Sequence, residues 1–149
     1  LPRAYTLIDR DMYTAASRSN LNMRIEPGTT VENVVLSTAA SRQNVKIEFV
    51  EGAGITVEKT FFQDQGNGTQ IFLLTITVAA NVALGDRSLL LTNPDGAHGP
   101  AIYGMLEIVA AGTLARPPQP AGLLKAISSE QELLPVSLKT MQLPSRTLN

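Results

Sequence analysis

The sequence from residue 55 to residue 78, ITVEKTFFQDQGNGTQIFLLTITV, decides the fold class. It holds two β-like runs, Ile55–Glu58 and Gln70–Val78, in which apolar and polar residues alternate as in strands with one buried face. Asp64–Gly68 lies between them, and its glycines and asparagine tolerate the positive φ angles that a tight hairpin turn requires. The apolar side of the longer run consists of Phe72, Leu74, Ile76 and Val78.

Short strand-like runs separated by turns continue in both directions from this hairpin. Upstream, Val45–Phe49 alternates strictly, and Val34–Leu36 is a further short apolar run. Downstream, Ser88–Thr92 leads into the turn Asn93–Gly96, which is followed by a last run over Ala101–Val109. About seven short strands at this spacing, with no helical pattern between them, are typical of a sandwich. We therefore expect an all-β, Ig-like β-sandwich of about seven antiparallel strands.

The segment Ile76–Gly96 resembles the last third of an IPT/TIG-type Ig-like domain. In that family a strand with an apolar–Thr–Val ending leads to a Gly-x-Arg corner, here Gly85–Arg87, and a short strand then ends at an Asn-Pro-Asp-Gly hairpin, here Asn93–Gly96. The likeness covers about residues 21–109 and departs from the family at Ser37–Ser41, where a Gly-x-Asn/Asp-Phe element is usual. The resemblance implies a spacer, adhesion or assembly module of a secreted or cell-surface protein, and it brings no catalytic residues.

Three parts of the chain differ in sequence pattern and composition. Residues 1–20 show no clean period and form either an incoming linker or a first strand. The sandwich is expected over 21–112, and an extended tail over 113–149. The tail begins with the Pro-rich Arg116–Pro120, which favours polyproline II and cannot join a central strand. Ala121–Leu134 is compatible with a short helix.

The composition excludes several classes of function. The formal net charge is -1, which gives no electrostatic reason to expect nucleic acid or an anionic membrane as partner. The chain has no cysteine, so disulfides, thiol catalysis and Cys-ligated metal sites are excluded. No apolar run reaches the roughly 18 residues expected of a transmembrane helix. These features do not fix a compartment; the resemblance implies an extracellular, cell-surface or periplasmic protein and leaves an envelope association open.

Few side chains could carry chemistry. His98 is the only histidine, and no Gly-x-Ser-x-Gly elbow accompanies it, so we expect neither an enzyme nor a cofactor. Asp64, Asn67 and Asp95 are oxygen donors in glycine-containing loops, which leaves a weak calcium site open, although turns need the same residues for backbone reasons. The absence of tryptophan makes an aromatic sugar-binding platform less expected.

The tail carries apolar side chains with little in their own segment to bury them. Burying one such side chain is worth about 1.5–3 kcal/mol, so exposing all of them would be costly. We expect the tail to dock on a neighbouring subunit or another protein, for instance by adding Leu134–Leu138 to an exposed sheet edge. A tail folded on its own sandwich and a disordered linker are the alternatives. The expected partner-binding residues are Leu133, Leu134, Val136, Leu138, Met141 and Leu143.

These observations predict a non-catalytic structural or assembly module of an extracellular or envelope-associated complex. The alternative is an adhesion or carbohydrate-binding Ig-like module. A tail that orders only with a partner would support the first role, and an exposed aromatic cluster beside a groove would support the second.

Overall fold

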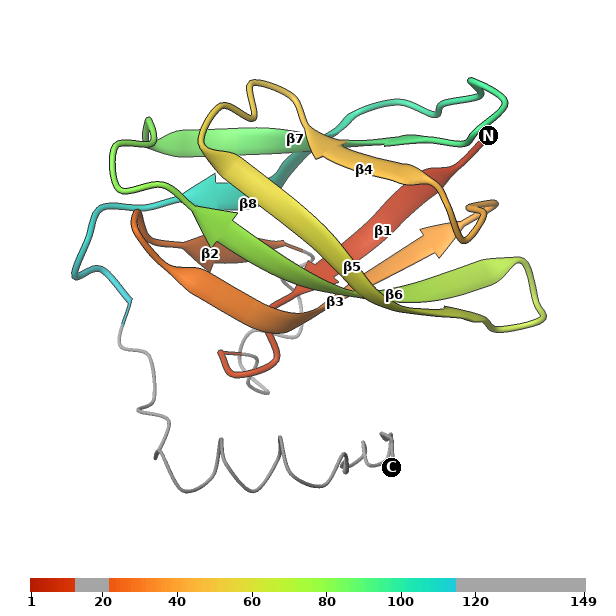
Figure 1. Ribbon diagram of the computed structural model, residues 1–149, viewed down its shortest axis with the longest axis horizontal. Helices are drawn as coiled ribbons and strands as arrows, with labels where there is room; N and C mark the ends of the chain where they lie inside the picture. Colours follow the sequence, from red (N-terminus) through yellow and green to blue (C-terminus); the bar gives the residue numbers. More distant parts are fainter. Residues whose placement is uncertain (13–21, 115–149) are drawn as a thin grey trace. The chain divides into compact units, whose positions relative to one another are not determined.

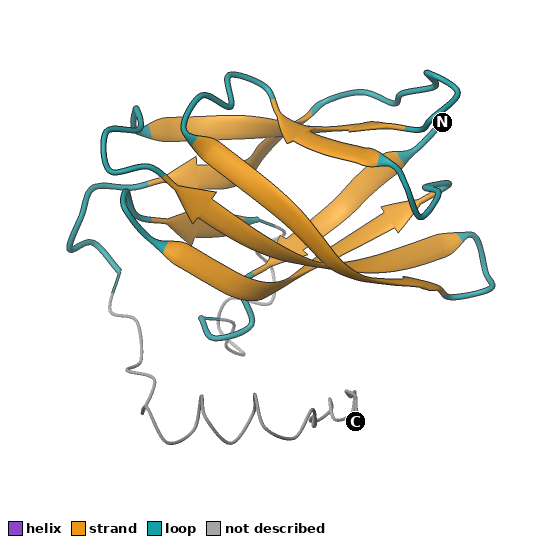
Figure 2. Cartoon of the chain, in the orientation of Figure 1, coloured by secondary structure: helices purple, strands orange, loops and turns teal. Residues whose placement is uncertain are grey.

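The computed structural model describes residues 1–12 and 22–114 of the chain (Figure 1). The regular structure in this part of the chain is strand throughout, without a helix (Figure 2). The strands form two four-stranded sheets, which confirms the all-β prediction. They are β1 (Arg3–Ile8), β2 (Met23–Ile25), β3 (Thr30–Ala39), β4 (Lys46–Phe49), β5 (Ile55–Asp64), β6 (Thr69–Val78), β7 (Gly85–Thr92) and β8 (Ile102–Ile108).

The strand order confirms the Ig-like sandwich. The first sheet has the order β1-β3-β6-β5 and the second the order β2-β8-β7-β4. Strands β1, β3, β6 and β5 correspond to A, B, E and D of an Ig constant-type domain, and β4, β7 and β8 correspond to C, F and G. The structure differs from the prediction in β2, a three-residue strand that pairs parallel to β8. A strand this short shows no period in a sequence.

Residues 1–20 contribute a strand to the first sheet. β1 pairs antiparallel with β3, with Leu7 opposite Leu36, so the sandwich includes residues upstream of position 21. Ala4 and Leu7 are buried because they face the core, whereas Arg3 is exposed. The segments Arg116–Pro120 and Ala121–Leu134, for which the sequence predicts polyproline II and a short helix, lie outside the described residues.

The core lies between the inward faces of the two sheets. Leu7, Leu36 and Phe72 are opposite one another across β1, β3 and β6, and each has an exposed fraction of 0%. The Phe72 ring also packs on Phe62 of β5, with ring centroids 5.0 Å apart and the planes tilted by 54°. The second sheet contributes Leu89, Leu91, Leu106 and Ile108.

A polar corner carries the chain from the first sheet to the second after β3. The Gln70 side-chain oxygen accepts a hydrogen bond from the Ser41 amide at 2.9 Å. Asn93 accepts from the Arg42 amide and donates to the Ala40 carbonyl, both at 3.0 Å. These contacts supply partners for buried polar groups, as a sandwich interior requires. The same hydrogen bonds hold Ala40 and Ser41 in place, at the end of the Ser37–Ser41 segment where the sequence departs from the IPT/TIG pattern.

Candidate functional site

The outer face of the first sheet carries an apolar row that crosses all four strands. In the strand register, Ile8 lies opposite Val35, Val35 opposite Leu73, and Leu73 opposite Phe61. Three of these side chains are partly buried and Phe61 is 47% exposed. We call these four residues the outer row; Ile71 flanks it on β6. The solvated face of an antiparallel sheet is normally polar, so this apolar row is a candidate contact surface.

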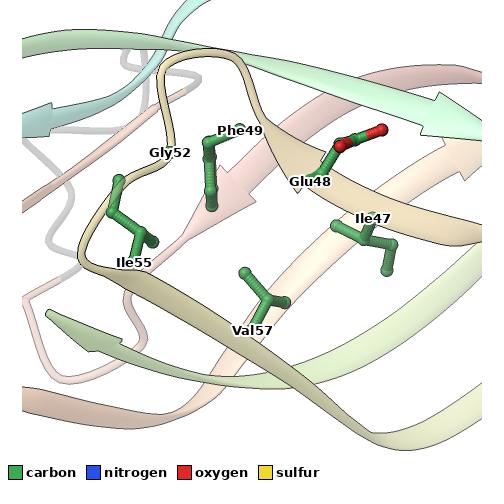
Figure 3. A pocket seen from close by; sticks show the side chains of 6 residues that line it. All are labelled: Ile47, Glu48, Phe49, Gly52, Ile55 and Val57. Atoms are coloured by element: carbon green, nitrogen blue, oxygen red, sulfur yellow. The ribbon is translucent and has the colours of Figure 1, made fainter.

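A second opening lies at one side of the sandwich, between the edge strands β4 and β5 (Figure 3); most of its lining residues are apolar, but most of the surface that it exposes is polar. It is a hollow of about 350 Å³. The side chains that extend into it from the two strands belong to the core or pack directly on it, so the interior is accessible here. We call this opening the β4–β5 seam. Its lining residues are Ile47, Glu48, Phe49, Gly52, Ile55 and Val57.

Lys59 closes the seam at one end. It lies opposite the buried Leu74, so its side chain starts from the inward face of β5. Its Nζ donates hydrogen bonds to the carbonyl oxygens of Gln43 at 3.2 Å and Val45 at 2.5 Å, next to the start of β4. Partial burial lowers the pKa of Lys59. The lysine therefore ties the two sheet edges together where the hollow ends.

Arg87 holds the turn at the other end of the seam. This buried side chain, 6% exposed, donates from Nε to the carbonyl of Glu51 at 2.9 Å and from Nη2 to that of Ala83 at 2.7 Å. Its Nη1 lies 3.2 Å from the carbonyl oxygens of both Gly85 and Asp86. The Gly85–Arg87 motif thus forms a structural corner that joins the β4–β5 turn to the loop before β7.

The outer edge of β5 is available along the seam. Within its sheet β5 pairs with β6 alone. Its register with β6 is continuous from Ile55 to Lys59 and shifts at Thr60, which forms a β-bulge. Bulges and inward-pointing lysines are devices that limit pairing of a sheet edge. The regular part of this edge is therefore Ile55–Glu58, directly beside the hollow, although the Ile55 amide already donates to the Gly52 carbonyl oxygen at 2.9 Å.

The point at which the chain leaves the sandwich is fixed by Glu26. The Val109 amide first bonds to the Ile25 carbonyl at 2.9 Å, which continues the β2–β8 pairing. The two carboxylate oxygens of Glu26 then accept hydrogen bonds from the amides of Gly112 at 3.0 Å and Leu114 at 2.6 Å. We call this contact the Glu26 clamp. It anchors the last described residues beside the β2–β3 loop.

The six predicted partner-binding residues of the tail lie outside the described residues, so the structure brings none of them to either opening. His98 is on an exposed loop after the Asn93–Gly96 turn, and its Nδ1 lies 3.1 Å from the Gly99 carbonyl oxygen. It forms an isolated bridge with Thr92. The contacts of His98 are therefore with the Gly99 carbonyl oxygen and the backbone of Thr92.

The three candidate calcium ligands act as turn residues. A side-chain oxygen of Asp64, Asn67 and Asp95 accepts a hydrogen bond from the backbone amide two residues further on, at 2.9–3.1 Å. This is the local bonding that makes these residue types suited to turns. No group of three or more His, Cys, Asp or Glu side chains that could hold a metal ion occurs within residues 1–12 and 22–114.

Tyr103 is the most exposed aromatic side chain of the described strands. It is 76% exposed on β8, and its hydroxyl donates to Asp86 Oδ2 at 2.9 Å. This hydrogen bond and the nearby carboxylate charge raise the pKa of Tyr103. The other exposed aromatic residues of the described strands, Tyr5 and Phe61, lie on the other sheet. The aromatic side chains therefore do not share one platform.

Sequence reasoning missed the outer row and the seam. The residues Ile71 and Leu73 make the first half of β6 apolar on both faces, and this uninterrupted run was the available signal. The alternation of Ile47–Phe49 and Ile55–Val57 identified two strands with apolar faces. It could not show that both strands become sheet edges that face each other across an opening.

A scan against protein-family models finds no match for this chain, and a search of curated proteins finds none either. The IPT/TIG resemblance therefore stays a prediction, while the Ig-like strand order rests on the structure itself. Across the described residues, the structure contains no helix of the length and apolar character needed to cross a membrane.

Proposed function

We propose that this chain is a non-catalytic assembly module of an extracellular or envelope-associated complex, in which the tail of one chain docks on a neighbouring subunit. The observation that carries the proposal is a pair of accessible surfaces on the sandwich to which apolar side chains contribute. These surfaces are the outer row and the β4–β5 seam. Accessible apolar surfaces are typical of protein-contact sites.

The tail supplies the complementary apolar side chains. Removing apolar surface from water yields about 25 cal/mol per Å², so two such surfaces gain stability by covering each other. The Glu26 clamp fixes the start of the tail at Leu114, and residues 115–149 continue from this point. A chain anchored in this way presents its tail from a defined position on each sandwich.

The module is proposed to be non-catalytic because the candidate acid–base residues considered above, which lie in the described part of the chain, serve local structure. His98 contacts a neighbouring loop carbonyl, and Asp64 and Asp95 accept bonds from their own turns. General acid–base catalysis instead needs such groups convergent within hydrogen-bond reach of a substrate. The extracellular or envelope location is supported by the IPT/TIG resemblance.

Light scattering after size exclusion tests the assembly role. The full chain is compared with a chain that ends at Leu114, which retains both bonds of the Glu26 clamp. We expect the full chain to self-associate and the shorter chain to be a folded monomer by circular dichroism. In the full chain, Val136→Asp should weaken association, whereas Ser137→Asp adds the same charge at the next position as a control. Association by the shorter chain, or a monomeric full chain, would contradict the proposal.

The alternative role as an adhesion or carbohydrate-binding module is favoured by one observation. Tyr103 presents an exposed ring whose orientation is held by Asp86, so an apolar face and a carboxylate lie together on the second sheet. A glycan array with the full chain and a Tyr103→Ala variant tests it. Binding that the substitution abolishes would establish this role, and an array without binding would remove it.

A further inference from the structure

We propose that the β4–β5 seam is an acceptor groove for Leu134–Leu138 of a second copy, which adds to the free edge of β5 as an antiparallel strand. This inference rests on the proposed assembly function and names the surfaces that meet.

The acceptor is defined by the seam and the edge together. A strand placed beside Ile55–Glu58 extends the first sheet by one strand and satisfies main-chain groups along that edge. Its inward side chains then enter the hollow lined by Ile47, Phe49, Ile55 and Val57. The length of the added strand is limited by Lys59 and the bulge at one end and by the turn that Arg87 holds at the other.

The donor segment has the matching pattern. Leu134, Val136 and Leu138 alternate with Pro135 and Ser137, so a strand over these residues has one wholly apolar face. Same-face side chains are about 6.6–6.8 Å apart in a strand, the same spacing as Ile55 and Val57 on β5. Proline is tolerated because the added strand forms the new sheet edge, where the missing amide faces away from β5.

Charge selects the antiparallel direction. If Val136 lies opposite Val57, an antiparallel strand brings Glu132 towards the Lys59 end of the seam and Lys139 towards the Glu51 end. A parallel strand would reverse this and bring Glu132 towards Glu51. The Lys139–Glu51 pairing favours the first arrangement, and the Glu132–Glu51 like-charge contact disfavours the second; at the other end Lys59 lies next to Glu58.

The tail is long enough to reach another molecule. About 20 residues separate Leu114, held by the Glu26 clamp, from Leu134, and an extended chain of this length spans at most about 70 Å. This exceeds the width of a four-stranded sheet, in which neighbouring strands lie about 4.8 Å apart. The connection can therefore bridge two sandwiches.

Disulfide trapping tests the register, because the chain contains no cysteine of its own. In the proposed pairing, Ser137 lies opposite Thr56, an exposed residue on the outer face of β5. Full-length Thr56→Cys and Ser137→Cys variants are prepared separately, mixed and oxidised. A cross-linked two-chain product is expected, since paired strands bring Cα atoms within the roughly 4.4–6.8 Å that a disulfide spans.

The matched control replaces Thr56→Cys with Thr30→Cys, an exposed threonine on the outer face of β3, away from the seam. The control mixture should give little cross-linked product. Equal yields from both mixtures, or no product from Thr56→Cys, would overturn the inference. A Thr56→Cys/Ser137→Cys double variant that cross-links within one chain, independently of concentration, would also overturn it, because the tail would then occupy its own seam.

A second full-length variant tests the hollow without cross-linking. Val57→Asp places a carboxylate among the apolar lining, and covering it with the added strand should weaken self-association about tenfold to a hundredfold. Circular dichroism establishes that the variant is folded. If removal of the tail abolishes association but Val57→Asp leaves it unchanged, this inference fails and the assembly function stands. If the full chain does not self-associate at all, the assembly function itself fails.

Discussion

Replacement of Arg87 tests how the corner beside the seam is held. Its guanidinium donates to four carbonyl oxygens, and the two shortest bonds, to Ala83 at 2.7 Å and Glu51 at 2.9 Å, join two separate loops. Arg87→Met keeps a long, flexible apolar side chain in the buried site but removes every donor. The substitution therefore measures the hydrogen bonds with little change in packing.

The magnitude follows from the two shortest bonds. A hydrogen bond to a charged group contributes about 1.5–3 kcal/mol, and the loop carbonyls regain some water when Arg87 is removed. We therefore take the lower end for each bond and expect Arg87→Met to lower the free energy of unfolding by about 3 kcal/mol. With a urea m-value of about 1.5 kcal/mol per molar, the unfolding midpoint falls by about 2 M.

Urea unfolding followed by circular dichroism is the assay. Arg87→Lys is the control, because it keeps the charge and the apolar stem but replaces the planar guanidinium by a single ammonium group. It should lower the free energy of unfolding by less than Arg87→Met does. A midpoint for Arg87→Met equal to that of the unmodified chain would refute the reasoning, since the four bonds would then add no net stability. The Met variant should also give less Thr56–Ser137 cross-link, because Glu51 belongs to the turn that ends the seam.

Three further predictions follow from the contacts described. Phe72→Ala should cost about 3–5 kcal/mol of unfolding free energy, whereas Leu73→Ala on the outer face should cost much less; thermal unfolding of both compares the two faces of one strand. Glu26→Gln leaves one side-chain oxygen for two amides, so amide exchange at Gly112 or Leu114 should quicken by about tenfold or more in hydrogen-exchange measurements. An NMR titration should show that the pKa of the Lys59 amine is lowered from its ordinary value. Because the pKa is lower in the folded chain, the unfolded chain binds more protons between the two pKa values, so the free energy of unfolding should rise with pH across that interval. An unshifted titration would contradict this.

The strands could be predicted because their alternation is local. Val45–Phe49 and Gln70–Val78 each reveal a strand without reference to the rest of the chain. β2 could not be found in this way, because Met23–Ile25 is too short to show a period and is a strand only through its pairing with β8. β1 was ambiguous for a related reason, since the bulge at Tyr5 interrupts its alternation.

The interaction surfaces were harder to predict because they depend on the order of strands in each sheet. Val57 looks like an ordinary core residue in the sequence and borders an opening only because β4 and β5 are both edges. The outer row arises from register, which brings Ile8 and Phe61 into line although they are far apart in the chain. Likewise, only the fold shows that the Gly85–Arg87 motif braces the turn at Glu51.

The parallel pairing of β2 with β8 has a consequence for an assembly whose members are joined through their tails. Tension arriving along the tail meets the Glu26 clamp first and then pulls β8 towards its C-terminal end. The rest of the sandwich holds β2 in place against this pull, so the two strands are sheared along each other. In that geometry the bonds between Met23–Ile25 and Leu106–Ile108 resist together rather than breaking one after another. In the proposed assembly, this short strand would therefore be loaded in shear along β8.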